Sequence, residues 1–472
     1  MNLYQSYLDF FSVSVEDLQK LIATALERGG DYADLFFEYS TLNNLILKDK
    51  KVAVAGSDID FGVGIRVLKG DQTGYAYAES TKTEKMMEAA KMAAVIASGD
   101  CRATAPVAVT ELRGPRHYPE ENSWDCYPAE RKIEFLQKLD SELYSRDSRI
   151  VNVRSSLSDS YDKFLFFNSL GEMAADSGPL SSVSVNIILK EGERTESCSA
   201  SRSFRMGSEM LGDALIDDLC AEVLHLGSTL MQEREMKGGE MPVVMAAGAS
   251  GILLHEAIGH AFEADFNRKQ ISIFSDKFGK KICDSSINIV DDATLQFNRG
   301  SINFDDEGVP GQKTYMVKDG VLNSYLHDRI SAKHYGVAPT GNGRRESFRF
   351  NPIPRMRATY MENGAATEAD LIAEVKNGVF VENFSNGQVQ IGAGDFTFFV
   401  LCGHLIENGR LTCPVKDINV IGNGPEALAA ITGVANNCKI DNGTWTCGKG
   451  QNVPVCCGMP SVLVGSLTVG GR

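Results

Sequence analysis

The chain has 472 residues, of which 62 are acidic and 47 basic, so its formal net charge is −15 at pH 7. Such a surface repels phosphate backbones, and we expect no binding of nucleic acid. No apolar run approaches the ~20 residues that a membrane-spanning helix needs. The N-terminal stretch MNLYQSYLDFFSVSVED lacks the basic segment of a signal peptide, and the 11 cysteines have no disulfide-framework spacing. We therefore expect a cytoplasmic protein with reduced thiols and no membrane contact.

The first hundred residues predict a mixed helix and sheet unit. Residues 14–29 have helical periodicity, with Ser14 and Asp17 as a capping pair and Gly29 as a terminator. Residues 81–99 return to helical periodicity. Between these helices we expect four strands, with a hairpin turn at residues 70–71; they cover 33–40, 44–52, 62–70 and 73–80.

Further along, helices are expected at 127–147 and 209–231, separated by a meander of antiparallel strands over 150–204. The stretch REMKGGEMP (234–242) breaks the pattern. We place the main boundary there, giving domains 1–235 and 236–472, with a further boundary near 110–125. The expected class is α+β: an N-terminal domain of helices and antiparallel sheet, then a β-rich C-terminal domain with one important helix.

That helix contains LLHEAIGHAFEAD (253–265), in which His255 and His260 are five residues apart. Zinc peptidases commonly use His-Glu-x-x-His, in which the histidines are four apart and share a helix face. Five residues correspond to about 140° of rotation in a regular helix, so the two rings would diverge. A π-bulge or irregular turn at Ala257–Gly259 brings them together, and such bulges cluster at functional sites. The sequence therefore predicts this irregularity.

Spacing alone leaves the remaining roles open. Glu256 follows the first histidine, where a glutamate can serve as the general base of a metallopeptidase. Glu263 and Asp265 can bind metal, orient a histidine or cap a helix face. The alternative is a buried helix with two hydrogen-bonded histidines. Candidates for a third ligand are Glu263, His327, His334, His404 and several C-terminal cysteines.

Several stretches resemble the TldD/PmbA family, specifically its TldD-type metallopeptidase subunit. They occur in the family's order across 240–472, and GVGIRVLKGDQTGYAYAES adds a weaker match in the N-terminal half. The stretches are LLHEAIGHAFEAD, DDEGVPG, TGNGRRES, NPIPRMRATYMENG, SNGQVQIGAGDFTFFV, GHLIENGRLTCPV, INVIGNG and CGKGQNVPVCCGMPSVLVGSLTVGG.

The resemblance implies that His255, His260 and Cys447 bind one divalent metal ion per chain, with Zn²⁺ as the expected ion, and that Glu256 is the catalytic base. A thiolate is a sound zinc ligand. The adjacent Cys456 and Cys457 do not occupy ligand positions and are interpreted as packed thiols. The resemblance also implies an enclosed site for peptides and unfolded segments. It further implies a dimer, either of two copies or with a PmbA/TldE-like subunit.

The two adjacent arginines and the glycine-rich stretch can each be interpreted in two ways. Arg344 and Arg345 can hold a substrate carboxylate or pair with a structural aspartate such as Asp305 or Asp306. The glycine-rich stretch SNGQVQIGAGDF suits a peptide added as a strand, or simply turns. Two alternatives to a peptidase remain: a peptide-binding, chaperone-like subunit with a structural metal, and regulation at DNA, suggested by the family's association with DNA gyrase. The acidic charge argues against direct DNA contact.

Overall fold

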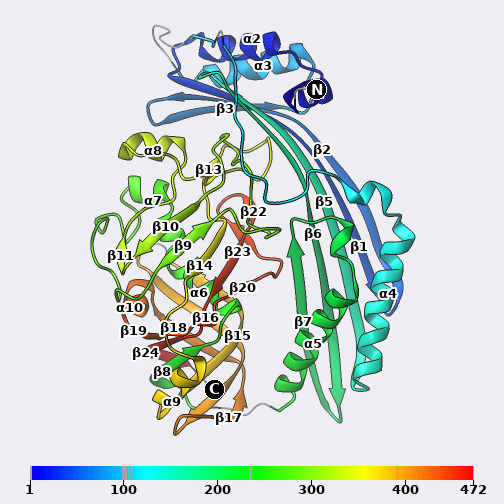
Figure 1. Cartoon of the computed structure of the whole chain (residues 1–472), viewed down its shortest axis with the longest axis vertical. Helices are drawn as coiled ribbons and strands as arrows, with labels where there is room; N and C mark the ends of the chain where they lie inside the picture. The colour runs from blue at the N-terminus through cyan, green and yellow to red at the C-terminus, as the bar shows by residue number, and fades with distance from the viewer. Residues whose placement is uncertain (1–2, 98–103, 107, 233–235, 391, 471–472) are drawn as a thin grey trace.

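The computed structural model describes residues 3–97, 104–106, 108–232, 236–390 and 392–470. One long, curved sheet dominates the N-terminal half, and the C-terminal half lies beside it (Figure 1). The expected α+β class is confirmed. No helix in the described ranges has the length and apolar character that a membrane crossing requires.

The N-terminal sheet has the strand order β3-β2-β1-β5-β6-β4, with β7 also paired to β6. Helices α1–α3 cover one end of it, and α4 and α5 cover the other end (Figure 1). The helices are α1 Leu3–Phe11, α2 Val15–Leu26, α3 Thr83–Ala94, α4 Ala129–Arg146 and α5 Asp213–Leu230, with short 3₁₀ turns η1 Ser123–Cys126 and η2 Ser208–Met210. The strands are β1 Tyr32–Lys48, β2 Lys51–Lys69, β3 Gln72–Ala78, β4 Thr110–Glu111, β5 Ile150–Asn168, β6 Glu172–Glu191 and β7 Arg194–Phe204.

The expectation of four strands before α3 is wrong, because the structure has three. The stretches 33–40 and 44–52 are one continuous strand, β1, followed by a tight turn and the start of β2. Asp49 and Lys50 make that turn with φ of +49° and +65°, the left-handed conformation of a two-residue hairpin. The predicted hairpin between β2 and β3 is confirmed.

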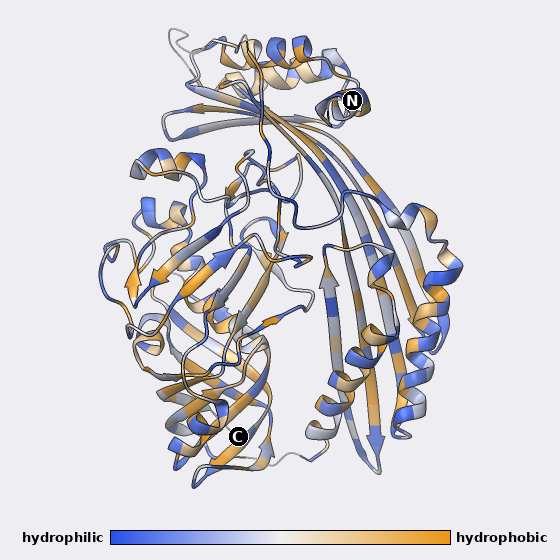
Figure 2. Ribbon diagram, in the orientation of Figure 1, coloured by the Kyte–Doolittle hydropathy of each residue, from blue (hydrophilic) through white to orange (hydrophobic). Residues whose placement is uncertain are grey.

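Side chains of β1 alternate between two environments, as the two-residue period of a strand requires. Leu35 and Phe37 pack against the helices. Phe36 points the other way and packs with Phe304 and Phe348 of the C-terminal half. The face of the sheet that carries Phe36 therefore meets the C-terminal half directly. Figure 2 shows this mixture of apolar and polar residues along the long strands.

The C-terminal half contains a closed ring of strands in the order β15-β8-β24-β18-β16, since β16 also pairs with β15. A second sheet, in the order β11-β10-β9-β14-β23-β20, packs nearby, and most of the buried apolar residues form one core. The ring strands are β8 Gly239–Met245, β15 Asn377–Val389, β16 Asp395–Glu407, β18 Ile418–Asn423 and β24 Val462–Gly470, with β17 Arg410–Val415 and β19 Ile431–Val434 at its edges. The second sheet comprises β9 Ile289–Asp292, β10 Lys313–Lys318, β11 Val321–Leu322, β14 Ala358–Met361, β20 Lys439–Asp441 and β23 Cys456–Met459.

Two short hairpins and three helices complete this half. Their bounds are β12 Gly343–Arg344 with β13 Ile353–Pro354, β21 Thr446–Gly448 with β22 Asn452–Pro454, α8 Arg329–Tyr335, α9 Glu368–Glu374 and α10 Gly424–Ala429. Gly387 of the glycine-rich stretch lies on β15, and a Cβ there would meet the Phe398 ring at 2.1 Å. Close packing between β15 and β16 therefore accounts for this glycine.

Candidate metal centre

The histidine segment follows β8 and changes its helical form four times. It begins with a 3₁₀ turn, η3 (Ala249–Gly251), and one turn of α-helix, α6 (Ile252–Leu254). A π-helical turn, η4 (His255–Gly259), comes next, followed by η5 (His260–Phe262) and α7 (Ala264–Arg268). The predicted irregularity at Ala257–Gly259 is therefore confirmed.

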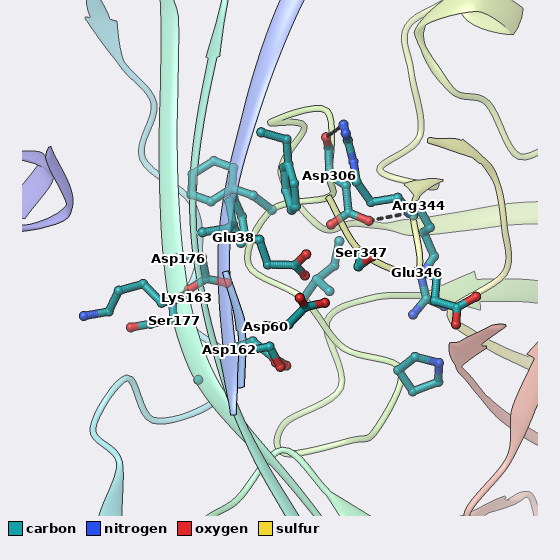
Figure 3. Close-up of a pocket in the computed structure, with 18 of the residues that line it drawn as sticks. Glu38, Asp60, Asp162, Lys163, Asp176, Ser177, Asp306, Arg344, Glu346 and Ser347 are labelled. Atoms are coloured by element: carbon teal, nitrogen blue, oxygen red, sulfur yellow. Dashed lines mark hydrogen bonds between the residues drawn. The ribbon is translucent and has the colours of Figure 1, made fainter. Parts of the chain in front are cut away.

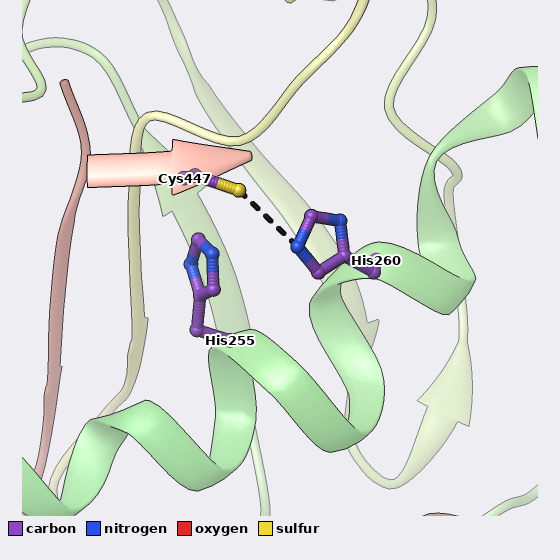
Figure 4. Close-up of side chains that lie close together, drawn as sticks. All are labelled: His255, His260 and Cys447. Carbon is purple, nitrogen blue, oxygen red and sulfur yellow. Dashed lines mark hydrogen bonds between the residues drawn. The ribbon is translucent and has the colours of Figure 1, made fainter. Parts of the chain in front are cut away.

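The π turn places both imidazoles on the same side of the segment (Figure 4). The ring centroids of His255 and His260 are 5.1 Å apart, and the ring planes are inclined at 79°. One extra residue per turn compensates for the five-residue spacing. The arrangement thus has the convergence that a regular α-helix would lack.

Gly259 fits this turn for a second reason that the sequence did not reveal. A Cβ built on Gly259 would lie 2.1 Å from Sδ of Met356 and 3.2 Å from the Leu254 carbonyl oxygen. Real Cβ atoms do not approach another atom so closely. Met356 is fully buried, so it has little freedom to move away. The glycine lets the π turn lie directly against the segment 355–357.

Cys447 completes a cluster with the two histidines (Figure 4). It lies in the middle of β21, and its Sγ is 3.2 Å from Nε2 of His260. One donor atom from each of His255, His260 and Cys447 lies within 4.8 Å of the others. Among the described residues, no other group of three or more His, Cys, Asp or Glu side chains has this geometry. All three side chains are buried.

Arg355 joins the two parts of this cluster, although the sequence analysis did not single it out. Its Nη2 donates to the Cys447 carbonyl at 2.6 Å, and its Nη1 donates to the Gln451 carbonyl at 2.9 Å. Its Nε lies 3.7 Å from Oε1 of Glu263. One buried guanidinium therefore holds the β21–β22 hairpin at a fixed distance from the histidine segment.

Glu263 approaches His260 from the side opposite Cys447. Its Oε2 lies 3.1 Å from Nδ1 of His260 and 2.9 Å from Nζ of Lys449. Lys449 also donates to Asp265 at 2.7 Å. A carboxylate on the outer nitrogen fixes the orientation of an imidazole and favours donation of the Nε2 lone pair.

The charges of these groups depend on one another. Burial lowers the pKa of His260, but the nearby Glu263 and Cys447 outweigh it and raise the pKa to about 10. Burial raises the pKa of Cys447, but His255 and His260 bring it down to about 5. Burial also opposes ionisation of Glu263, yet Lys449, His260 and Arg355 lower its pKa to about 2. Cys447 is thus favoured as a thiolate, the form that binds metal.

Two polar groups at the cluster have no hydrogen-bond partner in the described chain: Nδ1 of His255 and the Glu256 carboxylate. Nδ1 of His255 is buried and has no hydrogen-bond partner among the described residues. The Glu256 side chain is partly exposed, and no hydrogen bond or ion pair in the described chain engages its carboxylate. Burying a polar nitrogen without a partner is unfavourable, so an unsatisfied imidazole beside a thiolate fits a metal ligand set.

The other candidate third ligands lie elsewhere. His327 is buried among the Tyr325 and Tyr335 rings, and burial lowers its pKa to about 4. His334 is exposed, and Nδ1 of His404 lies 3.8 Å from Glu382. None of these three joins the cluster within the described residues.

Cys456 and Cys457 are packed thiols, as interpreted from the sequence. Both are buried in β23, and the Cys456 thiol donates to the Asp441 carbonyl at 2.7 Å. Burial raises the pKa of Cys456 to about 12 and that of Cys457 well above its usual value, with Glu256 among the charges that contribute at Cys457. Neither thiol is disposed to ionise.

Arg344 and Arg345 are both buried but have different surroundings. The Arg345 guanidinium donates to the Asp306 carbonyl at 2.8 Å, and its backbone N–H donates to the Asp306 carboxylate at 2.7 Å. Each contact joins a side chain of one residue to the backbone of the other, and the carboxylate that the Arg345 guanidinium approaches is that of Asp34, at 4.0 Å. Arg344 donates to the Met356 carbonyl at 2.6 Å, and both arginines line a separate cavity.

Comparison with known proteins places the chain in a family. The chain matches the PmbA/TldA metallopeptidase C-terminal domain over residues 238–471, the central domain over 122–227 and domain 1 over 33–97. It is 37% identical to the metalloprotease TldD homolog of Haemophilus influenzae, covering 98% of this chain and 97% of that protein. It is 29% identical to the zinc metalloprotease TldD homolog of Saccharolobus solfataricus, with coverages of 96% and 99%.

These matches thus place the protein among the metallopeptidase families. The chain belongs to the PmbA/TldD family, and its resemblance to the TldD type is confirmed. Solved structures share its fold: TldE from Thermococcus kodakarensis has a TM-score of 0.75 at 19% identity, covering 96% of this chain and all of that one. A candidate modulator of a DNA gyrase from Thermotoga maritima has a TM-score of 0.78 at 23% identity, with coverages of 96% and 99%. At sequence identities of 19% and 23%, these two structures support the fold and nothing more.

Proposed function

We propose that this chain is a metal-dependent peptidase in which His255, His260 and Cys447 hold one divalent ion, Zn²⁺. The observation that carries the proposal is the convergence of three buried donor atoms to within 4.8 Å. Two nitrogens and a thiolate are donors that zinc prefers, and a set of three leaves a coordination position for water or substrate. The unpartnered Nδ1 of His255 and the low pKa of Cys447 support the same assignment.

The chemistry supplied by such an ion is polarisation of the scissile carbonyl and of the attacking water. Glu256 acts as the general base: its carboxylate takes a proton from the water and delivers it to the leaving amine. The absence of competing hydrogen bonds in the described chain leaves this carboxylate available. Glu263 holds the His260 ring through Nδ1, and Arg355 holds the hairpin that carries Cys447.

The substrates that fit best are peptides and unfolded segments. We infer an enclosed site that a folded protein surface could not reach; the low exposure of His255, His260 and Cys447, at 2%, 5% and 4%, supports this inference. We further propose that residues 1–235 and 236–472 act as two domains, and that the chain works as a dimer, with a second copy or with a TldE-like partner in the cytoplasm. The TldE fold shared by a solved relative is consistent with such pairing.

The test is metal content by elemental analysis, combined with cleavage of an unstructured peptide by the same samples. We expect about one zinc ion per chain in the wild type, and loss of both metal and cleavage in Cys447→Ser. Cys283→Ser is the matched control, because Cys283 is also a buried thiol of the C-terminal core but lies outside the cluster. It should retain both properties.

Two outcomes would overturn the proposal. Unchanged metal and cleavage in Cys447→Ser would remove Cys447 from the ligand set. Stoichiometric metal with no cleavage, even after addition of a TldE-like partner, would favour a peptide-binding subunit with a structural metal.

A further inference from the structure

A cavity of about 500 Å³ lies between the long N-terminal sheet and the C-terminal half (Figure 3). Its size is within the range of small-molecule sites, about 300–1,000 Å³. Side chains of β1, β2 and β5 form one wall, and residues 344–347 with Arg349 and Arg357 form much of the other. None of His255, Glu256, His260 or Cys447 lines it.

The sheet wall is acidic, and Glu38, Asp60 and Asp162 gather there (Figure 3). Asp60 is already paired with Arg349. Asp162 accepts from the Ser40 hydroxyl at 2.6 Å, and Arg205 is 3.9 Å away. These two carboxylates are therefore partly satisfied.

Glu38 is the least compensated of these three acids. It accepts one hydrogen bond in the described chain, from the Phe348 N–H at 2.6 Å, and forms no ion pair there. Burial and the nearby Asp162 raise the pKa of Glu38 to about 8. This wall thus contains a carboxyl group, that of Glu38, for which the described residues provide no cationic partner.

The opposite wall carries two buried arginines, Arg344 and Arg357, beside the acidic residues Asp306 and Glu346. Arg344 and Arg357 are only 4% and 2% exposed, and neither forms an ion pair within the described residues. Arg344 makes one hydrogen bond, to the Met356 carbonyl. Arg357 donates through Nε to the Gly341 carbonyl at 3.3 Å, while its buried Nη2 has no partner in the described chain. Burial lowers the pKa of both arginines. The proximity of Arg357 adds to this effect at Arg344, whereas Asp306, Asp305 and Asp291 oppose it at Arg357.

The two sets of charges face a shared space without neutralising each other. If Arg344 and Glu38 were paired directly, their pKa values would shift in the opposite directions from those found. A buried guanidinium with an unpartnered nitrogen is well suited to a carboxylate, and a desolvated carboxylate is suited to an ammonium group. A ligand with both charges would satisfy both walls.

We propose that this cavity binds a short zwitterionic peptide, with its carboxylate against Arg344 and Arg357 and its ammonium against Glu38 and Asp162. A ligand with one charge leaves the opposite wall uncompensated, so the site discriminates against it. Lys163 comes from the same strand as Asp162, but its side chain points away from these carboxylates (Figure 3). The proposal concerns binding alone and stands independently of cleavage at the histidine and cysteine cluster.

The test is calorimetric titration of the dipeptide Ala-Ala into the full-length Glu256→Gln protein, in which the probe should not be consumed. The comparison ligands are N-acetyl-Ala-Ala, which lacks the ammonium, and Ala-Ala amide, which lacks the carboxylate. We expect each blocked ligand to bind at least about tenfold more weakly, because it leaves buried charges unpaired. Equal affinities of the three ligands, or no binding of Ala-Ala at millimolar concentration, would overturn the proposal.

Substitutions in the two walls of the cavity test whether Ala-Ala binds there. Glu38→Gln should remove most of the preference for Ala-Ala over its N-acetyl form, and Arg344→Gln should remove the preference over the amide. Lys163→Gln is the matched control for loss of one positive charge and should leave binding unchanged. Thermal unfolding establishes that each variant is folded. If Arg344→Gln is not, Glu38→Gln and the blocked ligands still decide the question.

Cys447→Ser distinguishes this cavity from the metal cluster. Unchanged Ala-Ala affinity in that variant supports a separate site. Loss of binding there, with retention in Glu38→Gln, would place the dipeptide at the cluster and overturn the proposal.

Discussion

Nδ1 of His260 and Oε2 of Glu263 lie 3.1 Å apart, and the Glu263 side chain is completely buried. If His260 binds metal through Nε2, this contact orients the ring and increases its basicity. We predict that Glu263→Gln lowers zinc affinity by about 10- to 100-fold, the usual effect of removing such a partner. Competition with a chromophoric chelator measures it. Asp265→Asn is the control, since Asp265 pairs with Lys449, and in the described part of the chain no hydrogen bond or ion pair joins it to His260. Equal affinities in the two variants would contradict the role of Glu263.

Glu256→Gln should separate metal binding from catalysis. The side chain is partly exposed and has no hydrogen-bond partner in the described chain, so the isosteric amide should leave the fold and zinc content unchanged. Loss of a general base reduces the rate by about 10²- to 10⁴-fold. Steady-state cleavage of an unstructured peptide at matched zinc content measures the change. Wild-type turnover in this variant would exclude Glu256 as the base.

The variant Gly259→Ala shows which of two opposing effects is larger, the helix propensity of alanine or the steric clash of its Cβ. Propensity alone predicts that alanine is more favourable than glycine by about 1 kcal/mol. The structure predicts the reverse, because the new Cβ would meet Sδ of Met356, and overpacking typically costs about 1–3 kcal/mol. Urea unfolding of the metal-free protein measures the free energy of unfolding. Gly56→Ala is the control, since nothing lies near its Cβ position; a more stable Gly259→Ala protein would show that the turn can relax.

Glu38 should make stability depend on pH. Its pKa in the folded protein is about 8, raised from 4.5 by burial and Asp162. Since the folded state holds this proton more tightly, the stabilising contribution is complete below pH 4.5 and is lost as pH rises through 8. We predict that Glu38→Gln gains stability relative to the wild type between pH 5 and 9, as measured by urea unfolding. A difference between the two proteins that is constant with pH would contradict the raised pKa.

The local sequence was sufficient to predict the irregular helical turn between the two histidines. The five-residue spacing of His255 and His260, with Gly259 before the second, required a departure from α-helical geometry within one short segment. The turn between β1 and β2 was missed for the opposite reason. Asp49 and Lys50 adopt left-handed conformations without a glycine to mark them, so one long strand was divided into two.

Cys447 could be assigned only through the family resemblance. It lies 187 residues from His260, and the hairpin that carries it is fixed by tertiary contacts from Arg355. No periodicity in either stretch encodes that contact. The cavity shows the same limit: Arg344 was a candidate for binding carboxylates, but Glu38 on β1 could be related to it only once the sheet and the C-terminal half were seen together.

The closed ring of strands has a consequence for the order of events during synthesis. β8, which leads directly into the histidine segment, pairs with β15 and with β24, and both are made much later. At about 5–20 residues per second, the 187 residues between His260 and Cys447 take about 10–40 s to translate. A nascent chain therefore carries two histidines long before the thiolate exists. If His255, His260 and Cys447 form the proposed metal site, the full set of ligands exists only after β21 has been made and the hairpin has packed beside the histidine segment.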